Sequence, residues 1–167
     1  MSKYRLPYCA LALTLCLVLP MWPAHAAPLV PGAPTPTITV EDQHGKPVHV
    51  DAGTQRLLFS AERTVNDMVS KVLAAQPAGV LARQQAVYVA DITAMPSLVT
   101  RLFALPKMRE LPFSMGLVRD AAELAQVAGI PRQPGAATVL RFKDGKLIEI
   151  LLARNELQLR AALGLDP

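Results

Sequence analysis

The sequence predicts an α/β domain in which helices cover a mixed β-sheet. Three observations support this: an alternating apolar and polar segment around a glycine turn, a strand–helix–strand segment, and a second strand–turn–strand unit near the end. Strands joined by a long helical crossover run parallel, whereas strands joined by a tight turn run antiparallel. The predicted sheet therefore contains both kinds of pairing.

Residues 1–26 have the three parts of a secretory signal peptide. The positively charged MSKYR is followed by the apolar LPYCALALTLCLVLPMW, and Ala24 and Ala26 place small residues at a cleavage site. We expect cleavage after Ala26 and a periplasmic or secreted protein without a membrane anchor. A retained transmembrane helix is the alternative, but Pro20 interrupts the apolar run and no basic anchor follows it.

Both cysteines of the chain, Cys9 and Cys16, lie within the predicted signal peptide. Lipid attachment at Cys16 is disfavoured because Leu15 precedes it, where processing needs a small residue. The cleaved chain would have no disulfide, thiolate metal ligand or cysteine nucleophile. Cleavage also removes Lys3 and Arg5 from a total of 17 basic and 13 acidic residues, and the weak remaining positive charge argues against nucleic-acid binding.

The rest of the chain divides into a lead-in and one domain. Residues 27–37 are rich in proline and small residues, which predicts an extended lead-in, and the domain spans 38–167. The predicted elements, in order, are a hairpin over 38–50, a buried strand over 55–60, a helix from 65 to about 76, a strand over 86–92, a helix over 97–110, a strand over 112–120, a short helix over 121–130, a hairpin over 137–153 and a last helix from 155 to 164.

Helix ends and turns carry their own signals. Thr64 is the predicted N-cap of the first helix, with Asp67 in its first turn. Asp144 and Gly145 are a strong hairpin signal. Asn155 is predicted to cap the last helix with Gln158 as its capping-box partner. The last helix is expected to stop at Gly164, and the helix over 97–110 carries Leu98, Leu102 and Leu105.

In this order, the elements resemble the thioredoxin-like fold, in its branch of peroxiredoxins and exported thiol-disulfide oxidoreductases. The matching segments are ITVEDQHGKPVHV, RLLFSAERTVNDMV, LPFSMGLVRDAAELAQVAGI and TVLRFKDGKLIEI, so the resemblance covers about 38–164. It implies a three-layer fold with a central mixed sheet, an N-terminal β-hairpin and flanking helices.

The resemblance also implies a reactive site where the strand over 55–60 meets the next helix, because a helix N-terminus lowers the pKa of a thiol. Thr64 and Asp67 occupy the aligned positions, and neither a hydroxyl without a neighbouring base nor a carboxylate exchanges disulfides. The family's loop proline aligns with Ala136 or Ala137, slightly after Pro134. The chain is therefore interpreted as a redox-inactive member of the fold.

Two functional hypotheses remain. In the first, the non-catalytic protein binds an unknown periplasmic protein or extended peptide at the groove that the old active site leaves. The candidate residues are Arg63, Thr64, Asp67, Ala136, Ala137 and Thr138. In the second, the protein is a small-ligand-binding protein or an enzyme that uses Arg63, Thr64 and Asp67 in place of thiols. Helix capping alone also accounts for Thr64 and Asp67.

The sequence predicts no metal site and no cofactor. His44 and His49 lie on one predicted hairpin, but their odd separation points them to opposite faces and no cysteine completes a site. Met68 is interpreted as a core residue, since the methionines are scattered along the chain. Neither a nucleophile elbow nor a glycine-rich phosphate loop is present.

Overall fold

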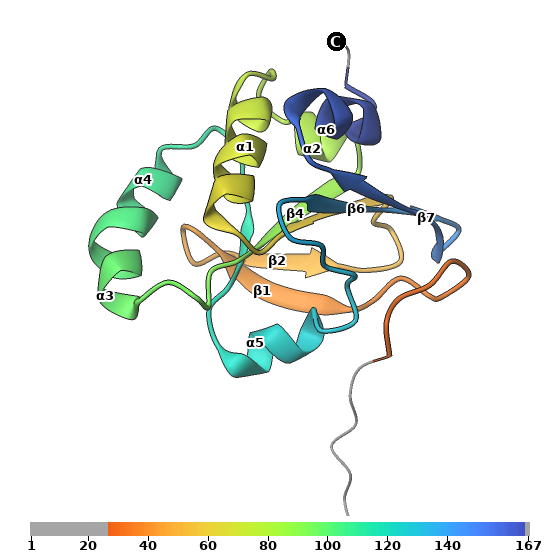
Figure 1. The fold of residues 1–167 in the computed structure, drawn as a ribbon, viewed down its shortest axis with the longest axis horizontal. Coiled ribbons are helices and arrows are strands. Elements are labelled where there is room, and N and C mark those ends of the chain that lie inside the picture. The colour runs from red at the N-terminus through yellow and green to blue at the C-terminus, as the bar shows by residue number, and fades with distance from the viewer. Residues whose placement is uncertain (1–26, 166–167) are drawn as a thin grey trace, which may run out of the picture.

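The computed structural model describes residues 27–165, so the predicted signal peptide and both cysteines lie outside the described residues. A seven-stranded sheet with the order β2-β1-β5-β4-β3-β6-β7 forms the centre of the molecule. Helices lie on both sides of it (Figure 1), which confirms the predicted three-layer α/β architecture with an N-terminal hairpin.

The strands are β1 (Ile38–Asp42), β2 (Pro47–Val50), β3 (Arg56–Ser60), β4 (Ala86–Asp91), β5 (Gly116–Val118), β6 (Ala137–Lys143) and β7 (Lys146–Ala153). The helices are α1 (Arg63–Ala74), α2 (Val80–Arg83), α3 (Ser97–Val99), the π-helix η1 (Thr100–Ala104), α4 (Leu105–Arg109), α5 (Ala121–Gln126) and α6 (Glu156–Leu163). β3, β4 and β5 pair in parallel, and the remaining neighbours are antiparallel. This is the mixed pairing expected from the long crossovers and tight turns.

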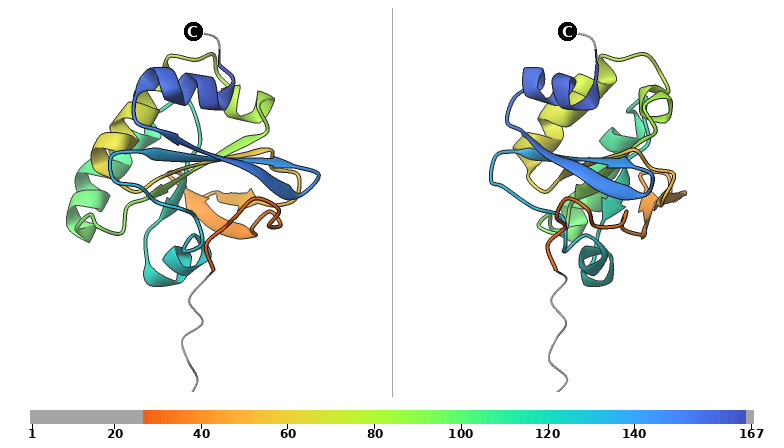
Figure 2. Two further views of the ribbon diagram at one scale, coloured as in Figure 1. Left: turned by 45° about the vertical axis from the view of Figure 1, so that its right-hand side comes forward. Right: turned by 90° about the vertical axis from the view of Figure 1, so that its right-hand side faces the viewer.

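Two apolar cores lie on the two faces of the sheet. On one face α1 and α6 pack over Leu58, Val139 and their neighbours, and on the other face α5 packs over Leu57 and Leu140. The views in Figure 2 show α1, α2 and α6 on one side of the sheet and α5 on the other. The proline-rich segment also joins this second face, because Leu29 N donates to the carbonyl of Gly129 at 2.7 Å.

The turn and cap residues in the sequence predicted the C-terminal hairpin and the last helix correctly. Asp144 and Gly145 have φ angles of 51° and 70°, as a primed hairpin turn requires. Asn155 Oδ1 accepts from Gln158 N at 2.9 Å, and Gln158 Oε1 accepts from the backbone one residue before the cap, at Arg154. Gly164 ends α6 in the left-handed conformation.

The helical segment after β4 differs from the single helix predicted over 97–110. It consists of α3, η1 and α4 in succession, and the wider π turn rotates the following residues about the axis. Leu98 and Leu102, two of the leucines on which that prediction rested, are 70% and 61% exposed. Only Leu105 of the three packs against the core.

Candidate functional site

A cavity of about 510 Å³ lies between α1 and the α3–η1–α4 segment, at the carboxyl ends of β3 and β4. We call it the α1–α4 pocket. Its lining residues come from the start of α1, from β4 and the loop after it, and from α3, η1 and α4: Ala61, Arg63, Asn66, Asp67, Ser70, Tyr88, Ala90, Asp91, Ile92, Ala94, Met95, Pro96, Val99, Phe103, Ala104, Lys107, Met108, Leu111 and Met115. Loops at the carboxyl ends of parallel strands are the usual place for ligands in α/β folds.

The walls of the pocket are mostly apolar. Met95, Met108 and Met115, which are far apart in the sequence, line the same cavity. Methionine side chains are unbranched and polarisable, so they adapt to differently shaped apolar partners. Met68 instead packs against the core beneath α1, as predicted.

The apolar lining continues outward onto an exposed surface. Leu98, Val99, Leu102 and Phe103 are 70%, 45%, 61% and 70% exposed. Val99 and Phe103 also line the pocket, so the exposed residues and the cavity form one continuous apolar surface. We call these four residues the η1 patch. A contiguous patch of large apolar side chains on a folded domain is typical of an interaction surface.

A buried polar cluster forms the floor of the pocket. The Ser60 hydroxyl donates to Asn66 Oδ1. The Tyr88 hydroxyl lies 2.8 Å from Ser60 Oγ and 3.3 Å from Asn66 Oδ1, so its single hydrogen bonds one or the other. These residues are brought together because β3 and β4 are parallel neighbours and α1 begins just after β3. Burial raises the pKa of the Tyr88 hydroxyl, which therefore stays neutral.

Asn66 Nδ2 is buried and has no hydrogen-bond partner among the residues that the structure describes. A buried donor without a partner costs about 1–3 kcal/mol of folding free energy. A native structure that keeps such a donor recovers this free energy through other interactions. Asn66 lines the α1–α4 pocket, although its Nδ2 atom is itself buried.

The rim of the pocket carries charges of both signs. Asp91 is only 6% exposed, and its carboxylate is fully engaged by Arg132 Nη1 at 2.9 Å and by the backbone and hydroxyl of Thr93. Arg132 also lies over the ring of Phe59, 4.9 Å from its centroid. Arg63, Asp67 and Lys107 complete the rim.

Comparison with solved structures identifies the fold. The structure superposes on the thioredoxin domain of a thiol-disulfide oxidoreductase from Bacteroides vulgatus with a TM-score of 0.52 and 12% identity, covering 83% of this chain and 99% of that one. It superposes on a peroxidoxin from Mycobacterium tuberculosis with a TM-score of 0.50 and 15% identity, covering 81% and 95% of the two chains. The chain has the thioredoxin-like fold. Neither a protein-family model nor a curated protein matches the sequence.

Within this thioredoxin-like fold, the predicted site residues separate into two groups. Arg63 and Asp67 line the α1–α4 pocket. The segment Ala136–Thr138 is buried, and Thr138 Oγ1 donates to the carbonyl of Pro131 at 2.7 Å. Thr64 is exposed and does not line the pocket. The structure therefore does not bring the six predicted residues together around one cavity.

The predicted capping of α1 is wrong. The helix begins at Arg63, two residues before the predicted start at Val65, so the cap position belongs to Glu62 instead of Thr64, and Asp67 falls beyond the first turn. The Glu62 side chain makes no cap hydrogen bond. Its Oε1 accepts from Gly135 N at 3.0 Å and so connects the start of α1 to the loop before β6. No peptide bond among residues 27–165 is cis.

Sequence reasoning missed Asn66 and Tyr88. The signal for Asn66 was its spacing, because Asn66, Val69 and Leu73 are three and seven residues apart and share the buried face of α1. The signal for Tyr88 was a phenol within an otherwise apolar buried strand, since such a hydroxyl needs a partner.

The described residues contain no group of three or more side chains suited to hold a metal ion. His44 and His49 are both exposed, and His49 Nδ1 lies 3.2 Å from Thr39 Oγ1. None of the helices between residues 27 and 165 has the length and apolar character needed to span a membrane.

Proposed function

We propose that this protein is an exported binding module without redox activity, which holds an apolar peptide segment of a partner protein in the α1–α4 pocket. The observation that carries the proposal is the continuity between this pocket and the exposed η1 patch. A cavity alone suits a small molecule, whereas a cavity that opens onto a strip of exposed apolar side chains suits a longer chain.

Charge favours a particular kind of peptide. Arg63 and Lys107 line the pocket, and Arg101 is exposed on η1. Among the described residues, Asp67 is the only acid on the rim that has no paired cation. An apolar segment flanked by Asp or Glu therefore matches the rim.

The lack of redox activity follows from the sequence at the start of α1. Residues 27–167 contain no cysteine, and Thr64 and Asp67 stand at the positions that align with the reactive thiols of the fold. Export is supported by the charged, apolar and small-residue segments of residues 1–26. Insulin reduction at the uncatalysed rate is the result expected from the protein alone.

The proposal is tested by selecting peptides from a random display library against the protein purified after expression of the full chain. Selected sequences should contain Leu, Met or Phe with neighbouring Asp or Glu. Replacing Phe103 by Ser should weaken binding about 10-fold or more, because burying a phenylalanine contributes about 1.5–3 kcal/mol.

The matched control is Leu157→Ser. Leu157 is as exposed as Phe103, at 70%, but it lies on α6, away from the pocket. Equal loss of affinity in both variants would contradict the proposal, since it would mean that binding depends on general surface hydrophobicity. Selection of no peptide, with a small molecule stabilising the protein through the same pocket, would favour the small-ligand alternative.

A further inference from the structure

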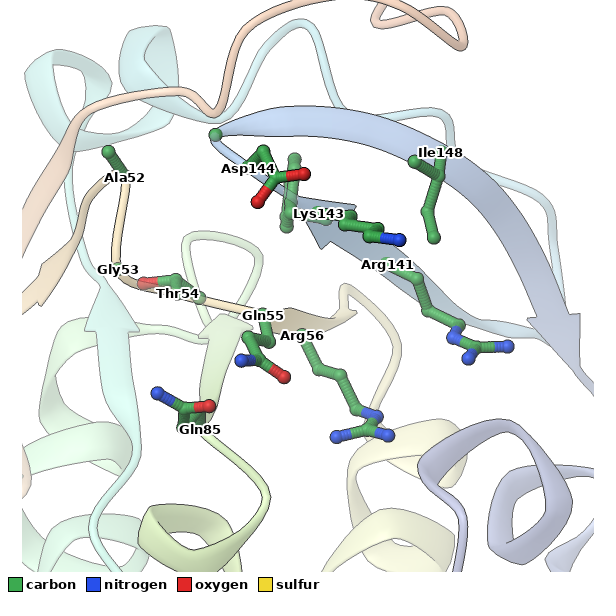
Figure 3. A pocket seen from close by; sticks show the side chains of 12 residues that line it. Ala52, Gly53, Thr54, Gln55, Arg56, Gln85, Arg141, Lys143, Asp144 and Ile148 are labelled. Atoms are coloured by element: carbon green, nitrogen blue, oxygen red, sulfur yellow. The ribbon is translucent and has the colours of Figure 1, made fainter.

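A second cavity, of about 580 Å³, lies at the opposite end of β3 from the α1–α4 pocket. It is bounded by the loop between β2 and β3, by Gln85 just before β4, and by the β6–β7 hairpin (Figure 3). We call it the basic cavity, because Arg56, Arg141 and Lys143 line it and Asp144 is the only acid among residues 27–165 that does so.

Arg56 and Arg141 are directly opposite each other in the antiparallel register of β3 and β6. Their side chains extend in the same direction from the two strands (Figure 3). Like charges at opposed positions of a sheet destabilise the pairing. A sequence that keeps such a conflict commonly does so at a functional position.

The protein compensates this conflict only in part. Arg141 Nη1 pairs with Glu149 at 2.9 Å. Among residues 27–165, Arg56 has no acidic partner: Nη1 donates to the carbonyl of Gln84 at 2.8 Å, while Nε is buried without an acceptor in this part of the chain. Burial and the charge of Arg141 both lower the pKa of the Arg56 guanidinium. An anion in the cavity would offset this repulsion between the two guanidinium groups.

Lys143 adds a third positive charge. It is exposed and forms no ion pair among residues 27–165, so its ammonium group is available. Within the described part of the chain, the acids facing the cluster are Glu149, which is engaged by Arg141, and Asp144 in the hairpin turn. The three cations therefore exceed the nearby acids even when both carboxylates are counted.

We infer that the basic cavity binds a small multivalent oxyanion, with the guanidinium groups of Arg56 and Arg141 as donors and Lys143 as an additional charge. Guanidinium groups are planar and present paired N–H donors that match the oxygens of phosphate and carboxylate groups. The cavity has room for more than a single phosphate, which favours a diphosphate or a polycarboxylate. This site does not depend on the peptide-binding proposal, because the two cavities share no lining residue.

The test is calorimetric titration of the protein, purified after expression of the full chain, with pyrophosphate and separately with citrate at low ionic strength. Binding of pyrophosphate alone would identify a phosphate site, and binding of citrate alone a carboxylate site. Lys143→Gln should weaken binding about 3- to 10-fold, and Arg141→Gln or Arg56→Gln more than 10-fold.

Lys46→Gln is the matched control, because Lys46 is exposed, lies outside the cavity and carries the same charge. It should change the affinity less than 2-fold. Equal weakening by Lys46→Gln and Lys143→Gln would overturn the inference, as would no binding of either anion. Lys143 is exposed and makes no ion pair, so its variant keeps the test valid if an arginine variant fails to fold.

Discussion

Asp42 offers the sharpest test of how the N-terminal hairpin is held. Its side chain is buried, and Oδ1 accepts from the backbone N–H groups of His44 and Lys46, each at 2.8 Å. Oδ2 accepts from the Ser114 hydroxyl at 3.0 Å, which connects the β1–β2 turn to the segment before β5. We predict that Asp42→Asn and Asp42→Ala destabilise the fold to different extents.

The magnitudes follow from these three hydrogen bonds. A hydrogen bond to a charged group contributes about 1.5–3 kcal/mol and a neutral one about 0.5–1.5 kcal/mol. In Asp42→Asn the amide oxygen still accepts from His44 and Lys46, and the Ser114 hydroxyl can rotate to accept from the amide nitrogen. The expected loss is about 1–2 kcal/mol. Asp42→Ala removes both acceptor oxygens and so all three hydrogen bonds, and a loss of about 2–4 kcal/mol is expected because hydrogen bonds to water offset part of it.

The difference between wild type and Asp42→Asn should depend on pH. Burial on its own raises the pKa of the Asp42 carboxyl, but the hydrogen bonds from Lys46, His44 and Ser114 lower it below the usual value. The stabilisation is therefore complete above the unfolded-state pKa of about 3.9, and it is lost as the pH falls through the folded-state pKa. Urea unfolding at pH 7 and at pH 3 measures the stability difference between wild type and Asp42→Asn at each pH. At pH 7 the Asn variant should unfold at roughly 0.5–1 M less urea than the wild type.

Asp51→Asn is the control for this prediction. Asp51 Oδ1 also accepts from a backbone N–H two residues later, Gly53 at 2.9 Å, but its side chain is exposed. Its replacement should cost less than about 0.5 kcal/mol. If Asp42→Asn costs no more than Asp51→Asn at pH 7, or costs the same at pH 3 as at pH 7, the hydrogen-bonded carboxylate does not stabilise the hairpin as argued.

Two further predictions concern the sheet itself. Tyr88→Phe removes the hydroxyl that bonds Ser60 and should lower the free energy of unfolding by about 1 kcal/mol. Because burial raises the pKa of Tyr88, the wild type should lose stability above about pH 10, and thermal melts across this range should show a smaller loss for Tyr88→Phe. Gly116→Ala places a Cβ 2.5 Å from Val40 Cγ2 and should cost about 1–3 kcal/mol in urea unfolding, whereas an unchanged midpoint would mean that β1 shifts freely.

The sequence predicted those parts of the fold whose causes are local. The Asp144-Gly145 turn and the Asn155 cap each depend on two or three adjacent residues, and both formed as predicted. The parallel pairing of β3 with β4 also follows from the length of the connection, because a long helical crossover joins parallel strands. Such features need no knowledge of what packs against them.

The prediction of the α1 cap was wrong because the tertiary structure competes with local preference there. Thr64 is a good N-cap by residue type, but Glu62 occupies the cap position because its carboxylate reaches Gly135 on a distant loop. Such a contact, 73 residues apart in sequence, leaves no local signal. The same holds for the polar cluster of Ser60, Asn66 and Tyr88, whose members meet only when β3, β4 and α1 are assembled.

The helix after β4 shows a different limit. An apolar period in the sequence identifies a stripe of side chains but does not say whether another element covers it. Leu102 and Phe103 belong to such a stripe and face solvent, because the π turn directs them away from the core. Exposure of this stripe is the observation that separates a binding surface from an ordinary buried helix.

The two cavities at the ends of β3 differ in the force that would hold a ligand. The α1–α4 pocket is mostly apolar, so affinity there comes from buried area and depends weakly on salt. The basic cavity contains Arg56 and Arg141, and its attraction for an anion is screened as ionic strength rises. A salt titration therefore assigns any ligand to one end of the strand or the other. If the affinities of both ligands changed equally with salt, the assignment of apolar binding to one end of β3 and electrostatic binding to the other would be refuted.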